Sequence, residues 1–154
     1  MLVTVVIICV AILVGAMLVQ RARDRAELEQ HSITPEELHA SLASGQDVAL
    51  FDVRLPLDLL SHSVVIPGAQ RLSPEEVIAN PSLIPGDRDS VVYCTCPSDQ
   101  TSRAVLQRAR AKGILRIRFL RGGLEGWQSH GFPVEPYEKP FHLSSGNKSA
   151  TVTG

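Results

Sequence analysis

The hydrophobic residues of the chain form one long apolar block followed by several short runs. The first twenty residues, MLVTVVIICVAILVGAMLVQ, carry no charged side chain. A helix of about 20 residues rises about 30 Å, which matches the hydrocarbon core of a bilayer. A secretory signal peptide would place basic residues before its apolar core, whereas here the charges follow it, in RARDRAELEQ. We therefore expect residues 1–20 to form a transmembrane anchor and residues 21–30 a juxtamembrane linker.

Beyond this block, segments that begin helices alternate with strand-like runs. TPEELHASLASG has Thr34 as N-cap, Pro35 at the first helical position and Glu37 three residues after the cap. This is the pattern of a capping box, and Gly45 supplies the stop. LSPEEVIANP repeats the pattern. Both segments predict helices.

Two apolar runs, VALFDVR and SVVYC, are typical of buried strands. TSRAVLQRARAKG predicts an amphipathic helix with a glycine stop, and GGLEGWQSHG a short final helix. ILRIRFL alternates imperfectly, as a strand near the edge of a sheet does. This alternation indicates an α/β domain with a mostly parallel sheet, whose chemistry gathers at the carboxyl ends of the strands.

Charge and composition narrow the class of protein. The net charge is −1 and 5% of the residues are aromatic, which argues against a nucleic-acid partner. The polar, aperiodic end of the chain predicts a disordered tail over residues 139–154, which leaves residues 31–138 for the folded domain. Arg21, Arg23 and Arg25 follow the apolar block, and the positive-inside rule then places the domain on the cytoplasmic side of the cell membrane.

The stretch SVVYCTCPSDQTSR contains two of the three cysteines, between a strand and a helix start. A cysteine near a helix N-terminus becomes a better nucleophile, because the N–H groups there lower its pKa. In the cytoplasm both cysteines are expected to be thiols. Inert packing is the alternative, more so for Cys94 than for Cys96, because free cysteines are often buried. Cys-x-Cys without a second ligand pair predicts no metal site, and no cofactor is expected.

In order, ITPEELHASLASGQDVALFDVR, IPGAQRLSPEEV, VVYCTCPSDQTSRAVLQRARAKG and FLRGGLEGWQSHGFPVE resemble a rhodanese homology domain, over about residues 31–135. The resemblance implies a central, mostly parallel sheet flanked by helices, here preceded by the one transmembrane helix. It also implies sulfur transfer through a cysteine persulfide. Cys96, not Cys94, has the family's spacing to Gly113, so it is the expected nucleophile. The active-site loop is then Pro97, Ser98, Asp99, Gln100, Thr101 and Ser102, in which Thr101 would help to hold the persulfide.

Two loop residues depart from the family pattern. Pro97 replaces the usual Arg and removes an N–H donor. Asp99 replaces the usual Gly, and we expect its negative charge to lie where an anionic donor approaches, which weakens the use of thiosulfate. We expect structural roles for Asp52 and Arg54, and an exposed loop position for His62.

The function predicted on this basis is a sulfurtransferase. A sulfane-sulfur donor would load Cys96, and a thiol acceptor would remove the outer sulfur, with Cys94 as a candidate resolving thiol. The alternative is a weakly active or inactive rhodanese-like binding module at the membrane. A phosphatase on a related fold would need Cys-x5-Arg, whereas six residues separate Cys96 from Arg103.

Overall fold

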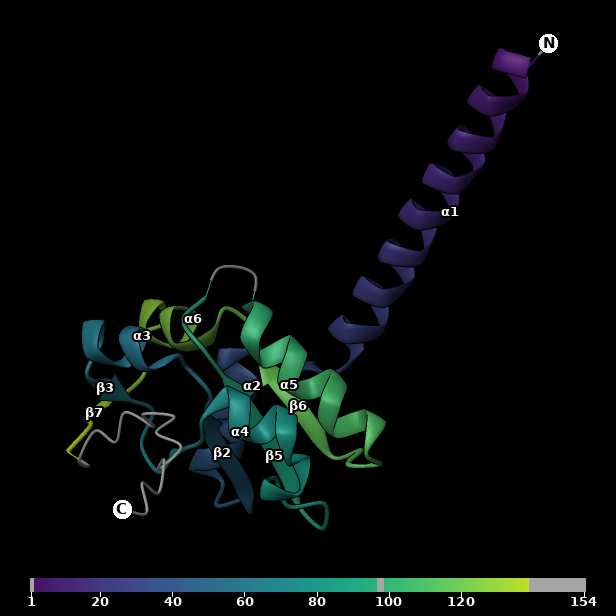
Figure 1. Ribbon diagram of the computed structural model, residues 1–154. Coiled ribbons are helices and arrows are strands. Elements are labelled where there is room, and N and C mark those ends of the chain that lie inside the picture. Colours follow the sequence, from purple (N-terminus) through teal and green to yellow (C-terminus); the bar gives the residue numbers. More distant parts are fainter. Residues whose placement is uncertain (1, 97–98, 139–154) are drawn as a thin grey trace, which may run out of the picture.

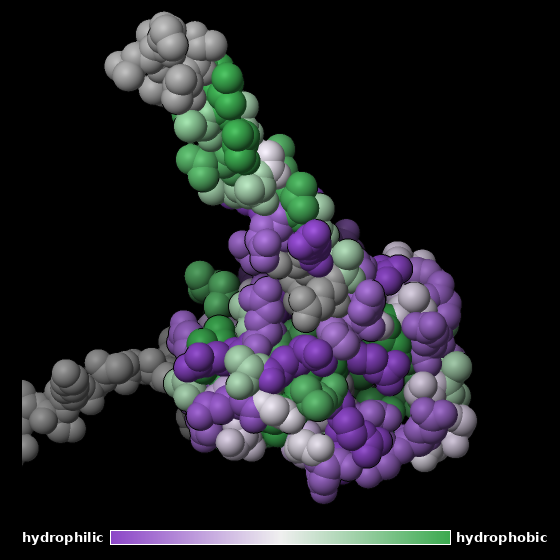
Figure 2. Space-filling view, turned by 90° about the vertical axis from the view of Figure 1, so that its right-hand side faces the viewer, coloured by the Kyte–Doolittle hydropathy of each residue, from purple (hydrophilic) through white to green (hydrophobic). Residues whose placement is uncertain are grey.

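The chain begins with a long helix that stands away from the rest of the molecule (Figure 1). The computed structural model describes residues 2–96 and 99–138, and the predicted disordered tail, residues 139–154, lies outside them. Helix α1 spans Leu2–Gln30, so residues 21–30, expected to be a linker, continue the helix. Its apolar side chains form a rod beside the largely polar surface of the domain (Figure 2).

The structure does not support the prediction that the first twenty residues span a membrane. In the part of the chain that the structure describes, no helix combines the length and the apolar character that crossing a bilayer requires. The described residues 7–19 of α1 are uncharged and, apart from Gly15, apolar. Arginines occupy the turn that follows.

The domain is built on a five-stranded sheet in the order β1-β6-β5-β2-β4. All of its pairings are parallel, as predicted. The strands are β1 (Ser32–Ile33), β2 (Val48–Asp52), β4 (Gln70–Arg71), β5 (Asp89–Tyr93) and β6 (Ile117–Leu120). The prediction that ILRIRFL lies nearer the edge of the sheet is confirmed, because β6 is the neighbour of the edge strand β1 and pairs with β5 on its other side. A two-residue strand such as β1 has too few positions to show a periodic pattern.

Among residues 31–96 and 99–138, five helices and one 3-10 turn connect the strands. They are α2 (Pro35–Ala43), α3 (Pro56–Ser61), α4 (Pro74–Ala79), η1 (Pro81–Leu83), α5 (Gln100–Ala111) and α6 (Gly123–Ser129). The predicted capping box of α2 forms, since the Glu37 N–H donates to Thr34 Oγ1 at 3.2 Å and the Thr34 N–H to Glu37 Oε2 at 3.0 Å. Ser73 begins α4 without a side-chain cap. A small antiparallel pair, β3 (Val64–Val65) and β7 (Glu135–Pro136), lies apart from the main sheet.

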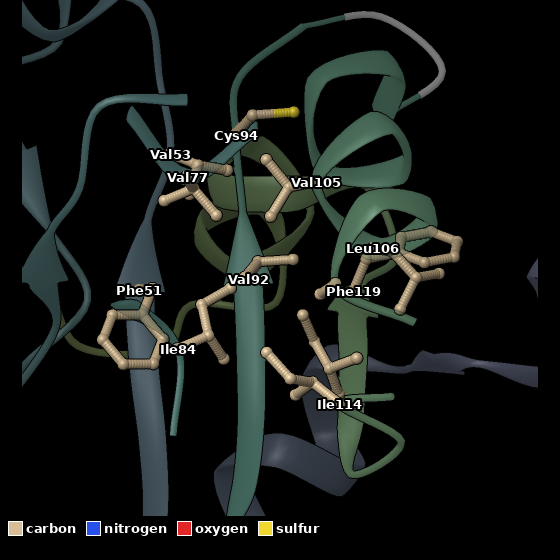
Figure 3. Packing of buried hydrophobic residues seen from close by; sticks show 12 residues of the cluster. Phe51, Val53, Val77, Ile84, Val92, Cys94, Val105, Leu106, Ile114 and Phe119 are labelled. Atoms are coloured by element: carbon tan, nitrogen blue, oxygen red, sulfur yellow. The ribbon is translucent and has the colours of Figure 1, made fainter. Parts of the chain in front are cut away.

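Successive strand residues point to opposite faces of the sheet and divide the core in two. On one face the strands pack against α4 and α5 (Figure 3). This first cluster contains Phe51, Val53, Val77, Ile84, Val92, Cys94, Val105, Leu106, Ala109, Ile114, Ile117 and Phe119. The second cluster, which includes residues of α2 and α6, contains Ile33, Leu38, Leu50, Ile66, Val91, Tyr93, Leu120, Leu124 and Trp127. With both faces covered, the carboxyl ends of the strands are the place where loops carry chemistry.

Candidate active site

The cysteine loop lies at the carboxyl end of β5, where the chain turns into α5. The strand ends at Tyr93 and the helix begins at Gln100. Pro97 and Ser98 lie outside the described residues. Gln100 is exposed at the first turn of α5, whereas Ser102 is fully buried there. The predicted arrangement of strand, loop and helix start is therefore confirmed.

Cys96 is held by the first turn of α5. The Thr101 N–H donates to Cys96 Sγ at 3.3 Å, and Thr101 Oγ1 lies 3.4 Å from the same sulfur. The first N–H groups of a helix have no partner within the helix, and its dipole favours negative charge there. Burial acts to raise the pKa of Cys96, but hydrogen bonds from Cys94 and Thr101 outweigh it and leave the pKa below its ordinary value. This environment stabilises a thiolate at Cys96.

Cys94 is buried beneath Cys96. Its side chain is 1% exposed and belongs to the first core cluster, as the packing interpretation predicted. Figure 3 shows its sulfur directed toward α5. Cys94 Sγ lies 2.7 Å from Cys96 Sγ, and both cysteines are free thiols. Burial above all raises the pKa of Cys94 to about 11, so it is Cys96 that carries the nucleophilic character.

Asp99 does not face an incoming donor, and this part of the sequence interpretation is wrong. Its side chain turns inward and is 6% exposed. Asp99 Oδ2 accepts a hydrogen bond from the Gly122 N–H at 2.9 Å. The backbone of Asp99 is left-handed, with φ 53°, a region that Asp adopts more readily than most residues. Asp99 therefore has a backbone conformation that favours glycine, and its carboxylate ties the loop to the turn before α6.

The glycine turn before α6 forms the floor of the loop. A Cβ on Gly123 would lie 2.0 Å from the Cys94 carbonyl oxygen. The same oxygen accepts the Leu124 N–H at 3.0 Å. The sequence predicted that Gly122 and Gly123 make a turn, but not that this turn supports the cysteine loop. No local signal links the two segments, because they are far apart in the sequence.

The end of α1 also reaches the neighbourhood of the loop, which sequence reasoning missed. Glu29 Oε1 lies 2.7 Å from Arg103 and Glu29 Oε2 lies 3.3 Å from Arg121. The Arg103 guanidinium also stacks over the Phe119 ring, 4.7 Å from its centroid. Arg103 is thus engaged by α1 and the sheet, and the structure shows no clamp of the phosphatase kind from this residue to Cys96.

Asp52 and Arg54 form a buried ion pair at the end of β2. The Arg54 guanidinium lies 2.5 Å from the Asp52 carboxylate. It also donates to the carbonyls of His62 and Val64, at 2.7 Å and 2.8 Å. The His62 side chain is exposed, and it is the backbone of this residue that holds Arg54. Asp52 and Arg54 thus have the structural character that we expected, and His62 has the exposed position.

Comparisons with known proteins agree with this geometry. A model of the rhodanese-like domain family matches residues 34–130. A sulfurtransferase of Allochromatium vinosum is 35% identical over 104 residues, which cover 68% of this chain and 94% of that protein. MoeZ of Mycobacterium tuberculosis, a probable adenylyltransferase/sulfurtransferase, is 34% identical over 109 residues, but the match spans 27% of its length. The crystal structure of the Alr3790 protein from Anabaena, 28% identical, superposes with a TM-score of 0.57 over 68% of this chain and 82% of that one.

Proposed function

Because the chain belongs to the rhodanese-like domain family, we propose that it is a sulfurtransferase that carries sulfane sulfur as a persulfide on Cys96. The observation that carries this proposal is the hydrogen bond that the Thr101 N–H, at the start of α5, donates to Cys96 Sγ at 3.3 Å. The same donors that favour a thiolate also favour the anionic persulfide that replaces it.

The reaction has two displacements. The Cys96 thiolate attacks the sulfane sulfur of the donor, the S–S bond of the donor breaks, and the rest of the donor leaves with the electron pair. An acceptor thiolate then attacks the outer sulfur of the persulfide, and the Cys96 thiolate is regenerated. Covalent catalysis of this kind divides one transfer into two easier steps.

The surroundings of Cys96 favour a persulfide donor, on a protein or a small molecule, over thiosulfate. Within the described residues, the hydrogen-bond partners of Cys96 Sγ are Cys94 and Thr101, neither of which is a cation. Arg103 and Arg121 are paired with Glu29, and Pro97 has no N–H to offer a second anionic group.

The proposal is tested by measuring sulfur transfer from glutathione persulfide and, separately, from thiosulfate to an added thiol. We expect Cys96→Ser to lose at least about a hundredfold in rate, whereas Cys9→Ser, which removes a cysteine outside the domain, keeps the rate. We also expect the persulfide to be the better donor. If Cys96→Ser transfers sulfur as fast as the unmodified chain, the assignment of the nucleophile fails. If no donor is used at all, the binding-module alternative is favoured.

We keep the cytoplasmic face of the cell membrane as the proposed location of the chain. The support is the apolar surface of α1, where Ile7 is 62% and Leu13 68% exposed, followed by the arginines from residue 21 onward. Fractionation of cells tests this: the full chain should sediment with membranes and a chain lacking residues 1–20 should not. Equal distribution of the two would contradict the proposed location.

A further inference from the structure

The two thiols of the loop are close enough to react with each other. Cys94 Sγ and Cys96 Sγ are 2.7 Å apart, and a disulfide bond is about 2.05 Å long. An approach of about 0.7 Å would therefore join them. Cys96 is partly exposed and reachable from outside, whereas Cys94 is 1% exposed and lies on the inner side of the same sulfur.

This arrangement determines which sulfur Cys94 can attack. A donor reaches Cys96 from the exposed side, so the sulfur that it adds lies on the side away from Cys94. The inner sulfur of the persulfide, Cys96 Sγ, is then between the attacking thiol and the leaving outer sulfur, which is the in-line geometry of thiol–disulfide exchange. Attack on the outer sulfur would instead move it onto a buried residue, out of reach of an external acceptor.

We propose that Cys94 resolves the Cys96 persulfide, so that the domain releases its outer sulfur as hydrogen sulfide and forms a Cys94–Cys96 disulfide. This inference rests on the proposed function, because it begins from the loaded persulfide. It adds a second activity: in the presence of an acceptor thiol the domain transfers sulfur, and in its absence the domain reduces that sulfur to sulfide.

The step balances without an external oxidant. The bond between Cys94 Sγ and Cys96 Sγ forms, and the bond between Cys96 Sγ and the outer sulfur breaks. The outer sulfur leaves with the electron pair, takes the proton of the Cys94 thiol and departs as HS⁻. The two cysteine sulfurs are oxidised to a disulfide while the sulfane sulfur is reduced to sulfide. An external dithiol, small or protein-borne, then reduces the disulfide and restores both thiols.

A buried hydroxyl lies beside the attacking thiol. Ser102 Oγ is fully buried and has no hydrogen-bond partner among the described residues. Its hydroxyl and its N–H both act on Cys94 in the direction that lowers the pKa of that thiol.

The experiment uses the full chain with Cys9→Ser, so that Cys94 and Cys96 are its only cysteines. The protein is loaded briefly with glutathione persulfide whose outer sulfur is ³⁴S, desalted, and followed by intact mass without added thiol. We expect an adduct of about 34 Da that decays to a species about 2 Da lighter than the dithiol, with about one labelled sulfide released per chain. Peptide mapping should find the Cys94–Cys96 disulfide.

The matched variant adds Cys94→Ser, and a second variant adds Cys94→Ala in case a buried hydroxyl disturbs the fold. In both we expect the adduct to persist at least about tenfold longer and no lighter species to form. If the adduct lasts equally long with and without Cys94, the resolving role is overturned while the proposed function stands. If Cys96 never loads, both fail. If the Cys94 variants do not fold, the disulfide and labelled sulfide of the Cys9→Ser chain decide the question alone.

Discussion

Gly123 offers a stability test of the way the cysteine loop is supported. Its backbone is left-handed, with φ +53°, and a Cβ there would lie 2.0 Å from the Cys94 carbonyl oxygen. Gly45 is a matched control, because it has φ +72° and nothing within 4 Å of its Cβ position. An alanine at either position therefore has a strained, left-handed backbone, but only the alanine at position 123 also collides with a neighbouring atom.

The magnitudes follow from these two geometries. A left-handed conformation costs a residue with a Cβ about 1–2 kcal/mol relative to glycine, so Gly45→Ala should lower the free energy of unfolding by about that amount. At Gly123 the colliding atom belongs to the backbone, so no side-chain rotation relieves the contact and the turn must move away from Cys94. That movement also breaks the hydrogen bond from Leu124 to the Cys94 carbonyl. We expect a total loss of roughly 3–5 kcal/mol for Gly123→Ala.

Urea unfolding of the two variants and the unmodified chain measures the difference. Because the turn carries the loop, Gly123→Ala should also change the rate at which iodoacetamide alkylates Cys96, and Gly45→Ala should leave that rate unchanged. Equal losses of stability in the two variants would refute the proposed packing of the turn against Cys94.

Three further predictions test other parts of the site. Arg54→Met should cost about 3–5 kcal/mol, because it leaves a buried carboxylate unpaired, while Arg88→Met, which breaks an exposed pair, should cost less than about 1 kcal/mol; similar losses in urea unfolding would contradict this. Burial raises the pKa of Asp99, so its charged form is penalised in the folded protein. Asp99→Asn should therefore be more stable than the unmodified chain at neutral pH, with a gap that closes as the pH falls through the acid range; a constant gap would argue against a buried charge. Thr101→Val should move the midpoint of Cys96 alkylation to higher pH, because it removes a hydroxyl that lowers the pKa of that thiol, whereas Thr101→Ser should not; identical midpoints in the two variants would exclude this role of the hydroxyl.

The sequence predicted those features that depend on local pattern. The capping box depends on the four consecutive residues from Thr34 to Glu37, and it forms as expected. The strand before Cys94 and the helix after the loop have enough length for apolar patterns to show. The family spacing to Gly113 selected Cys96 as the nucleophile, and Cys96 is the cysteine whose sulfur accepts a hydrogen bond from the Thr101 N–H.

Features that depend on contacts between distant segments were not predictable in this way. The inward turn of Asp99 depends on the Gly122 N–H, which a different part of the chain supplies. Similarly, the two-residue strand β1 pairs with β6, which lies far away in the sequence. For α1 the sequence indicated an apolar helix, and the helix forms, but no span is found in the described part of the chain.

The central claim is that Cys96 carries the sulfur, and the most direct measurement is the mass of the cysteine-loop peptide after brief loading with a persulfide donor. We expect one added sulfur, about 32 Da, in the unmodified chain and in Cys94→Ser, and none in Cys96→Ser. An adduct that survives Cys96→Ser, or that disappears with Cys94→Ser alone, would contradict it.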